Sequence, residues 1–284
     1  AWQALRTRHL DTAAAIAAGN ATLHDALVAD FDALRKDLEA LAAGETDEAR
    51  IARVHGLGEV VSSRLVQAAL GEDWARLDAR DVLVVHPGEM GVGVEWEASR
   101  TKLATWRATQ PSQRIVATGF IARGRDGNDT TLGRNGSDYS AAILAHLFDA
   151  DELSIWTDVD GVLSADPRLV PDATVLPTLS YAEAWELAYF GAKVLHPQTM
   201  APVQARGIPL CIRNTLNPSA PGTWILAENP EGDAELSPVK GLTIVRDMAV
   251  LELAGNAMVG VPGTAEKLFA ALHRAGVSVV MISQ

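Results

Sequence analysis

Leucine and phenylalanine side chains recur every three or four residues near the start of the chain, from Leu23 to Leu41. On a helix of about 3.6 residues per turn, this spacing places them on one face. Gly19 and Gly44 interrupt the pattern, and a further helical stretch is expected from residue 45 to residue 70. The pattern therefore predicts that residues 1–70 form helices packed against one another.

The pattern changes at Asp81, where apolar residues begin to come in short runs. Short apolar runs bounded by turn residues are typical of buried strands. We expect strands at residues 82–85, 114–120, 153–157 and 208–212, a turn at 125–128, and helices at 136–150 and 180–189. Ser180 and Glu183 have the spacing of a capping box at the start of the helix expected at 180–189. Strands that alternate with helices predict an α/β domain with a largely parallel sheet.

A change in composition precedes residue 240. Segments 217–222 and 228–238 are rich in proline, glycine, asparagine and acidic residues, which is typical of a domain boundary. We therefore expect two domains, 1–239 and 240–284. For the second domain we expect strands at 242–245, 249–253 and 277–282, and a helix that starts near Pro262, buries Leu268, Phe269 and Leu272, and ends at Gly276. This is the pattern of a small α+β domain that is cut in its middle.

The composition is that of an ordinary globular protein, with 48% apolar and 21% charged residues. A formal net charge of −12 argues against general nucleic-acid binding, which depends on neutralising phosphates. No apolar run approaches the roughly 18 residues that a membrane span needs, and Arg6, Arg8 and Asp11 argue against a signal peptide. The single cysteine, Cys211, is typical of a reducing compartment, so we expect a cytoplasmic protein.

Several common catalytic signatures are missing from the sequence. It contains no Gly-x-x-x-x-Gly-Lys-Ser/Thr phosphate loop, no Gly-x-Gly-x-x-Gly dinucleotide loop and no Gly-x-Ser-x-Gly elbow. The seven histidines lack ligand spacing, so we expect no metal site built from protein side chains. These absences argue against a dinucleotide-dependent oxidoreductase, a serine hydrolase and a zinc enzyme.

Polar side chains gather where the predicted turn leads into the next predicted helix. Gly133 and Gly136 let the backbone approach a ligand, and the free N–H groups of a helix start favour an anion. Arg134 can grip a carboxylate through two parallel hydrogen bonds. A plain loop in which Ser137 or Asp138 caps the helix is the alternative.

Three further clusters lie at or near the ends of predicted elements. Residues 156–161 and 166–168 place acids and an arginine after a strand, which suits contacts with a nucleotide or Mg²⁺; a solvated turn is the alternative. Lys193 lies between two helical segments and could neutralise a transferring phosphoryl group, or be a lone surface lysine. Glu59 interrupts an otherwise apolar helix, and a paired structural glutamate is its alternative.

Together these clusters resemble an aspartokinase of the amino acid kinase family. The resemblance rests on the order and spacing of six motifs: Leu57-Gly58-Glu59 with Ser62, Thr118-Gly119-Phe120-Ile121, Thr131 to Asp138 with Tyr139, Ile155 to Gly161, Asp166-Pro167-Arg168, and Phe190 to Pro197. Residues 260–284 resemble the first half of an ACT regulatory domain. These residues and Asn135 are similar to the aspartokinase part of bifunctional aspartokinase–homoserine dehydrogenases.

The resemblance implies a three-layer αβα sandwich with a mainly parallel central sheet that lacks its first strand, followed by a partial ferredoxin-like ACT domain. It implies transfer of the γ-phosphoryl group of ATP, with nucleotide-bound Mg²⁺, to the β-carboxylate of L-aspartate. That reaction is the first step of lysine, threonine and methionine biosynthesis. A carboxylate with a pKa of about 3.9 is ionised at neutral pH and needs no general base, so positioning and charge neutralisation can carry catalysis.

The resemblance also implies regulation and assembly. It suggests L-threonine as an effector and a homo-oligomer, and it leaves open an NADP-dependent homoserine dehydrogenase on the same polypeptide. The residues that it implies for the site are Arg134, Glu59, Gly136 and Ser137 for aspartate, Asp138 and Lys193 for catalysis, Thr157, Asp158, Asp166, Arg168 and Lys193 for ATP, and Gln284 for threonine.

Two features depart from the family pattern. Leu163 stands where many aspartokinases have tyrosine, and no Lys-Phe-Gly-Gly-Thr-Ser motif occurs. In the family, that motif forms an inner strand and supplies a phosphate-binding lysine. We therefore expect the chain to be a fragment, shortened at both ends, and inactive or nearly so by itself.

Two other functions stay open on the sequence alone. An amino-acid-sensing module would use the ACT part without local catalysis. A kinase of glutamate or acetylglutamate would share the fold but bind a different acceptor. No nucleic-acid or membrane partner is expected.

Overall fold

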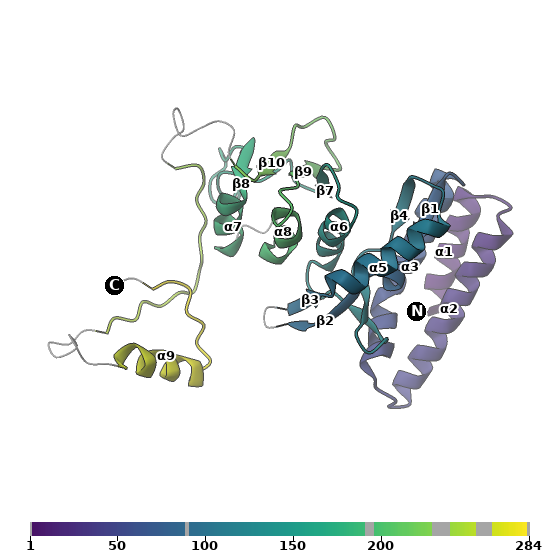
Figure 1. Ribbon diagram of the computed structural model, residues 1–284, viewed down its shortest axis with the longest axis horizontal. Coiled ribbons are helices and arrows are strands. Elements are labelled where there is room, and N and C mark those ends of the chain that lie inside the picture. The colour runs from purple at the N-terminus through teal and green to yellow at the C-terminus, as the bar shows by residue number, and fades with distance from the viewer. Residues whose placement is uncertain (1, 89–90, 191–195, 229–238, 254–262, 283–284) are drawn as a thin grey trace. The chain divides into compact units, whose positions relative to one another are not determined.

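The computed structural model describes residues 2–88, 91–190, 196–228, 239–253 and 263–282 (Figure 1). They belong to two compact units, Ala1–Ile244 and Val245–Gln284. Among the described residues, three hydrophobic clusters all lie in the larger unit.

Three helices open the larger unit: α1 (Trp2–Ile16), α2 (Ala21–Ala42) and α3 (Glu48–Leu70). Their shared core contains Ala13, Leu23, Leu27, Phe31, Leu34 and Val61. The predicted helical start of the chain is therefore confirmed. The buried face of α2 is shorter than its periodicity predicts, because Leu38 is 37% exposed. Near this position α2 and α3 are joined by the Arg53–Asp37 ion pair, at 2.8 Å.

Eight short elements follow: β1 (Trp74–Leu77), α4 (Ala79–Val82), β2 (Val84–Gly88), β3 (Gly91–Val94), α5 (Trp96–Thr109), β4 (Arg114–Ala117), β5 (Ile121–Gly124) and β6 (Asp129–Thr131). β1 pairs in parallel with β4. The other strands form a sheet in the order β3-β2-β5-β6, in which only β2 and β5 are parallel.

Two strand predictions in this region are wrong in detail. The strand expected from Val82 begins at Val84, because α4 occupies the preceding residues after its N-cap Asp78. The strand expected over 114–120 ends at Ala117, and the next strand, β5, belongs to a different sheet. It breaks because Phe120 takes a left-handed φ of 62°, which a strand cannot accommodate.

The rest of the larger unit contains α6 (Gly136–Leu147), β7 (Leu153–Thr157), β8 (Thr178–Ser180), α7 (Tyr181–Tyr189), α8 (Pro197–Gln204), β9 (Leu210–Asn214) and β10 (Thr223–Leu226). The strands form a sheet in the order β7-β9-β10-β8, and Figure 1 shows α6, α7 and α8 on one side of it. The capping box of α7 is confirmed, because Ser180 accepts from the Glu183 N–H while the Glu183 carboxylate accepts from the Ser180 N–H.

The α/β class is confirmed. Among the described residues the strands fall into three sheets, with β1/β4, β2/β5, β7/β9 and β8/β10 parallel and the remaining pairs antiparallel. Apolar side chains of α6, α7 and α8 fill the space against β7, β8, β9 and β10. Cys211 of β9 is fully buried.

The smaller unit has one described helix, α9 (Thr264–Arg274), which follows Gly263 and precedes Gly276, both with positive φ. None of its side chains is buried, and Phe269 is 37% exposed, so the predicted buried face is wrong for the described residues. The strands expected at 242–245, 249–253 and 277–282 are described without ladder pairing. An extended segment becomes a strand only when a second one lies beside it.

No helix within the described ranges combines the length and the apolar character that crossing a membrane requires.

Candidate active site

Glu59 lies in the middle of α3, half-buried, and joins three segments of the chain. One carboxylate oxygen accepts from the Gly119 N–H at 3.3 Å, and the other accepts from the Ser137 hydroxyl at 3.5 Å. Gly119 lies in the turn between β4 and β5, and Ser137 lies in the first turn of α6. Within the described part of the chain Glu59 has no ion-pair partner, and its two hydrogen bonds come from a backbone amide and a hydroxyl.

The turn between β4 and β5 is fixed from both sides. The buried hydroxyl of Thr118 accepts from the Ala79 N–H at 2.8 Å. A Cβ at Gly119 would lie 3.2 Å from the Cα of Ser137, so a larger residue would push the turn and α6 slightly apart. The position of Gly119 relative to Ser137 is thus set by direct backbone contact.

The start of α6 is open to a ligand. Its N-cap residue is Asn135, in the left-handed region at φ 56°, and no side chain caps the helix. Ser137 and Asp138 lie inside the first turn, so the alternative in which one of them caps the helix is wrong. Uncapped N–H groups at the positive end of the helix dipole favour an anion. Arg134, one residue before Asn135, is exposed and has no ion-pair partner among the described residues.

Asp138 follows on the same turn and is half-buried. Burial raises the pKa of its carboxyl above the ordinary value, because the charged form loses hydration. A carboxyl held in this way responds strongly to cations brought near it. The first turn of α6 therefore combines an anion-favouring backbone with one perturbed acid.

A second group of polar residues lies at the carboxyl end of β7, where open α/β sheets usually bind ligands. The Thr157 hydroxyl donates to Asp158 at 3.2 Å, and the Thr157 carbonyl accepts from the Thr215 N–H at 2.8 Å. Asp160 accepts from the side-chain amides of Asn214, at 2.8 Å, and Asn217, at 3.1 Å. The loop after β7 is therefore tied to the loop after β9.

Asp166 and Arg168 form a two-pronged ion pair farther along the same loop. Arg168 Nε donates to one Asp166 oxygen at 2.9 Å and Nη2 to the other at 2.6 Å. Hydrogen bonding to Asp166 raises the pKa of the guanidinium, which stays cationic. Both side chains are accessible to solvent, so the Arg168–Asp166 ion pair is not part of the buried core.

Two predicted site residues lie outside the described residues. Lys193 belongs to the segment between α7 and α8, and Gln284 ends the chain. Along the sequence, the nearest described residues on either side of Lys193 are Phe190 and His196. Phe190 is the C-cap of α7, and His196 caps α8 by accepting from the Gln198 N–H at 3.3 Å.

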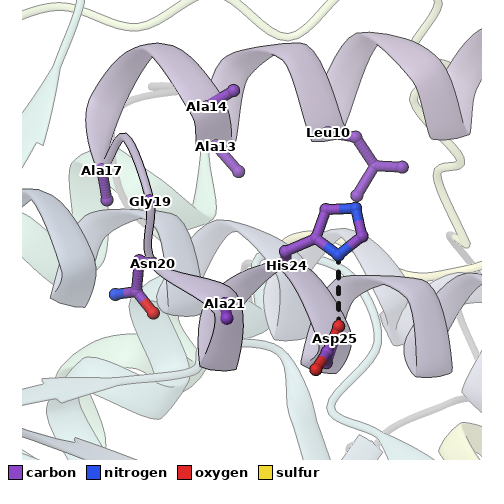
Figure 2. Close-up of a pocket in the computed structure, with 9 residues that line it drawn as sticks. All are labelled: Leu10, Ala13, Ala14, Ala17, Gly19, Asn20, Ala21, His24 and Asp25. Carbon is purple, nitrogen blue, oxygen red and sulfur yellow. Dashed lines mark hydrogen bonds and ion pairs between the residues drawn. The ribbon is translucent and has the colours of Figure 1, made fainter.

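A cavity of about 330 Å³ lies elsewhere, between α1 and the start of α2 (Figure 2). Small side chains such as Ala13, Ala17 and Ala21 line it, together with His24 and Asp25, whose side chains are 3.2 Å apart. None of the residues predicted for catalysis or binding lines this cavity. We therefore place the site at the two polar groups described above.

The sequence analysis missed part of the site. It did not single out Asn214 or Asn217, although the run Asn-Thr-Leu-Asn-Pro directly after a predicted strand was a usable signal. It also missed Ser140 of α6, whose buried hydroxyl accepts from the Phe120 N–H at 2.8 Å, because a serine inside an apolar helix carries no pattern of its own.

The sequence matches the profile of the Amino acid kinase family over residues 5–214. The chain belongs to the amino acid kinase family. An ACT domain profile matches residues 251–284.

Two relatives within the amino acid kinase family are bifunctional. The chain is 44% identical over 286 residues to bifunctional aspartokinase/homoserine dehydrogenase 1, chloroplastic, of Zea mays, covering 98% of this chain and 31% of that protein. It is 42% identical over 260 residues to the bifunctional aspartokinase/homoserine dehydrogenase of Haemophilus influenzae, covering 90% of this chain and 31% of that protein. The chain thus spans 31% of the length of these relatives. The resemblance to their aspartokinase part is confirmed.

Solved aspartokinase structures share the fold. E. coli aspartokinase III in complex with aspartate and ADP superposes with a TM-score of 0.77 at 27% identity, covering 100% of this chain and 63% of that chain. The same enzyme in complex with lysine and aspartate gives a TM-score of 0.68, covering 93% of this chain and 59% of that chain. The expected amino acid kinase fold is confirmed.

Proposed function

We propose that the chain is the kinase part of an aspartokinase, which phosphorylates the β-carboxylate of L-aspartate with ATP and yields 4-phospho-L-aspartate and ADP. The observation that carries the proposal is the meeting of Glu59, Gly119 and Ser137 at the open start of α6. It sets a carboxylate opposite an anion-favouring turn, and a zwitterionic amino acid matches both charges. The related E. coli enzyme is known with aspartate and ADP bound.

In this proposal the substrate spans the gap between α3 and α6. Glu59 holds the ammonium group. Arg134 holds a carboxylate through paired hydrogen bonds, with the backbone of Gly136 and the hydroxyl of Ser137 beside it. The Ser137 hydroxyl, which donates to Glu59 in the free protein, is then available to the substrate.

The chemical step needs no base. An oxygen of the ionised β-carboxylate attacks the γ-phosphorus of ATP, and the bond from that phosphorus to the β,γ-bridging oxygen breaks. ADP leaves with the electron pair. Lys193 offsets negative charge on the phosphates, and Asp138 orients the cationic groups around the transferred phosphoryl. Burial raises the pKa of the Asp138 carboxyl, and a cation beside it would favour the ionised form that this role needs.

The loop after β7 is the proposed nucleotide site. Thr157 and Asp158 contact ATP, and Arg168 reaches the phosphates while Asp166 holds its guanidinium on one edge. The Asp160 oxygen facing the loop already accepts two amide hydrogen bonds, and no cluster of three or more metal-binding side chains occurs within the described residues. These residues fit Mg²⁺ that arrives bound to the triphosphate.

Regulation and assembly belong to the same proposal. The ACT match supports an amino-acid effector, which we propose is L-threonine bound at a site that includes Gln284. We further propose a homo-oligomer, and cytoplasmic placement stays a prediction. The bifunctional relatives support a homoserine dehydrogenase on the same polypeptide.

Coupled ADP release from the purified full-length protein tests the proposal, with L-aspartate, L-glutamate and N-acetyl-L-glutamate as acceptors, because the chain by itself is expected to be inactive or nearly so. Turnover with aspartate in large excess over the other two supports an aspartokinase. Preference for another acceptor overturns the substrate assignment. Calorimetric titration with threonine, aspartate and MgATP separates the remaining alternative, because binding of threonine alone indicates a sensing module without local catalysis.

A further inference from the structure

Ser140 connects the start of α6 to the turn between β4 and β5. Its hydroxyl is buried, with the residue only 1% exposed. The oxygen accepts from the Phe120 N–H at 2.8 Å, and the hydroxyl donates to the Gly136 carbonyl at 2.8 Å. One side chain therefore satisfies a backbone group on each of two segments.

The Phe120 N–H belongs to a residue with an unusual backbone conformation. Phe120 has a φ of 62°, a region that bulky residues rarely adopt. Such a conformation persists only where its surroundings over-determine it. The Ser140 oxygen is the acceptor on the amide side of Phe120, and the Phe120 carbonyl accepts from the Leu132 N–H at 2.8 Å.

Close packing follows from this hydrogen bond. A Cβ at Gly136 would come within 2.7 Å of the Phe120 ring, and one at Gly119 within 3.2 Å of Ser137. Neither glycine therefore has room for a side chain without movement of its neighbours, so the turn and the start of α6 lie close together. Gly119 in turn donates to Glu59. A continuous path runs from Ser140 through Phe120 and Gly119 to the carboxylate of Glu59.

We propose that Ser140 is a positioning residue that fixes the spacing between Glu59 and the start of α6, and thereby the length of amino acid that the site accepts. This inference rests on the proposed function of that site. The hydroxyl does not touch the substrate; it acts through the Phe120 turn. Without it, the Gly119 N–H is no longer held against Glu59, and the gap between the two charge-binding ends widens or fluctuates.

The test compares Ser140→Ala with Ser140→Thr, which keeps the hydroxyl, in the purified full-length protein. We expect Ser140→Ala to raise the KM for aspartate about tenfold, the scale of one lost hydrogen bond to a buried amide. The KM for ATP should stay within about twofold, and the preference for aspartate over glutamate should narrow. Ser140→Thr should restore both values.

Ser99→Ala is the matched control. Ser99 is also a buried helical serine whose hydroxyl accepts from a strand N–H, that of Val84, at 3.0 Å. It should lower the Tm as much as Ser140→Ala does but leave the KM for aspartate unchanged. An unchanged KM for aspartate in Ser140→Ala, or an equal rise in both KM values, overturns the positioning role.

Amide hydrogen exchange separates this inference from the proposed function. Ser140→Ala should speed exchange at the Phe120 amide at least tenfold while Ser140→Thr and Ser99→Ala do not. Unchanged exchange overturns the inference even if aspartate is the substrate. A full-length protein that phosphorylates no aspartate overturns the proposed function, and the selection of aspartate with it. Fast exchange at the Phe120 amide in Ser140→Ala then still supports the contact between Ser140 and the turn.

Discussion

Asp138 is a residue whose proposed catalytic form, the ionised carboxylate, lowers the stability of the folded protein. Its carboxyl is half-buried in the first turn of α6, and burial raises its pKa. Because the folded value lies above the unfolded one, the native state binds the extra proton between the two values. Stability then falls as the pH rises through that window, and the ionised carboxylate costs stability at pH 7.

Asp138→Asn should therefore raise the Tm at pH 7 while lowering kcat by about 10²-fold, the scale of one lost electrostatic contact. The gain in Tm should shrink as the pH falls toward the ordinary Asp value, where the wild-type carboxyl is also neutral. Thermal melts between pH 3 and pH 8, with kcat at pH 7, check this. A variant that is less stable at pH 7 contradicts the assignment.

Arg134 should act on one substrate only. Its guanidinium is exposed and has no ion-pair partner among the described residues, so its removal leaves no buried charge unpaired. Arg134→Ala is expected to raise the KM for aspartate far more than the KM for ATP, with little change in Tm. Steady-state kinetics check this, with Arg8→Ala on the exposed face of α1 as the control for lost charge. Equal effects on both KM values would remove Arg134 from the aspartate site.

At the scale of elements, the sequence predicted features that depend on neighbouring residues, but not features that depend on contacts between distant segments. The capping box of Ser180 and Glu183 lies within four consecutive residues, so the sequence alone located the start of α7. The β2–β3 hairpin was missed, and of the β5–β6 hairpin only the turn at 125–128 was predicted, because strand pairing leaves no mark in the apolar pattern. The break at Phe120 was missed for a related reason: its left-handed φ is supported from α6, twenty residues away.

The loops after β7 and β9 form one element-scale unit, because Asp160 accepts from Asn214 and Asn217. Asn214→Ala should loosen the loop that carries Thr157 and Asp158 and raise the KM for ATP by about tenfold. The KM for aspartate should change much less. Asn128→Ala, which removes an exposed amide bonded to Asp126 at 2.9 Å, is the control and should change neither KM. A result in which Asn214→Ala affects only the Tm would make the tie purely structural.

Across the whole larger unit, the site depends on separate cores holding distant segments together. The residues of the turn from Arg134 to Asp138 could be predicted from their own sequence, since they are contiguous. The contact between Glu59 and Ser137 could not be derived from spacing, because 78 residues and several elements separate them. Only the packing of α3 against the rest of the unit brings that carboxylate to α6.

The three-helix core should therefore matter for substrate binding as well as for stability. Leu27 is fully buried in it, and Leu27→Ala should lower the free energy of unfolding by about 2–5 kcal/mol. Leu38→Ala, at the 37% exposed position of the same helix, should cost clearly less. Urea unfolding followed by circular dichroism checks both. Equal losses would contradict the early end of the buried face of α2.

The burial of Cys211 offers a built-in reporter. The chain has one cysteine, and it lies fully enclosed in β9 between β7 and β10. Burial also raises the pKa of its thiol, which keeps it in the unreactive protonated form. Any reaction with a thiol dye must therefore come from a molecule in which these strands have parted. The rate of labelling therefore reports how often the strands separate. Slower labelling in the presence of MgATP would show that nucleotide binding stabilises this sheet.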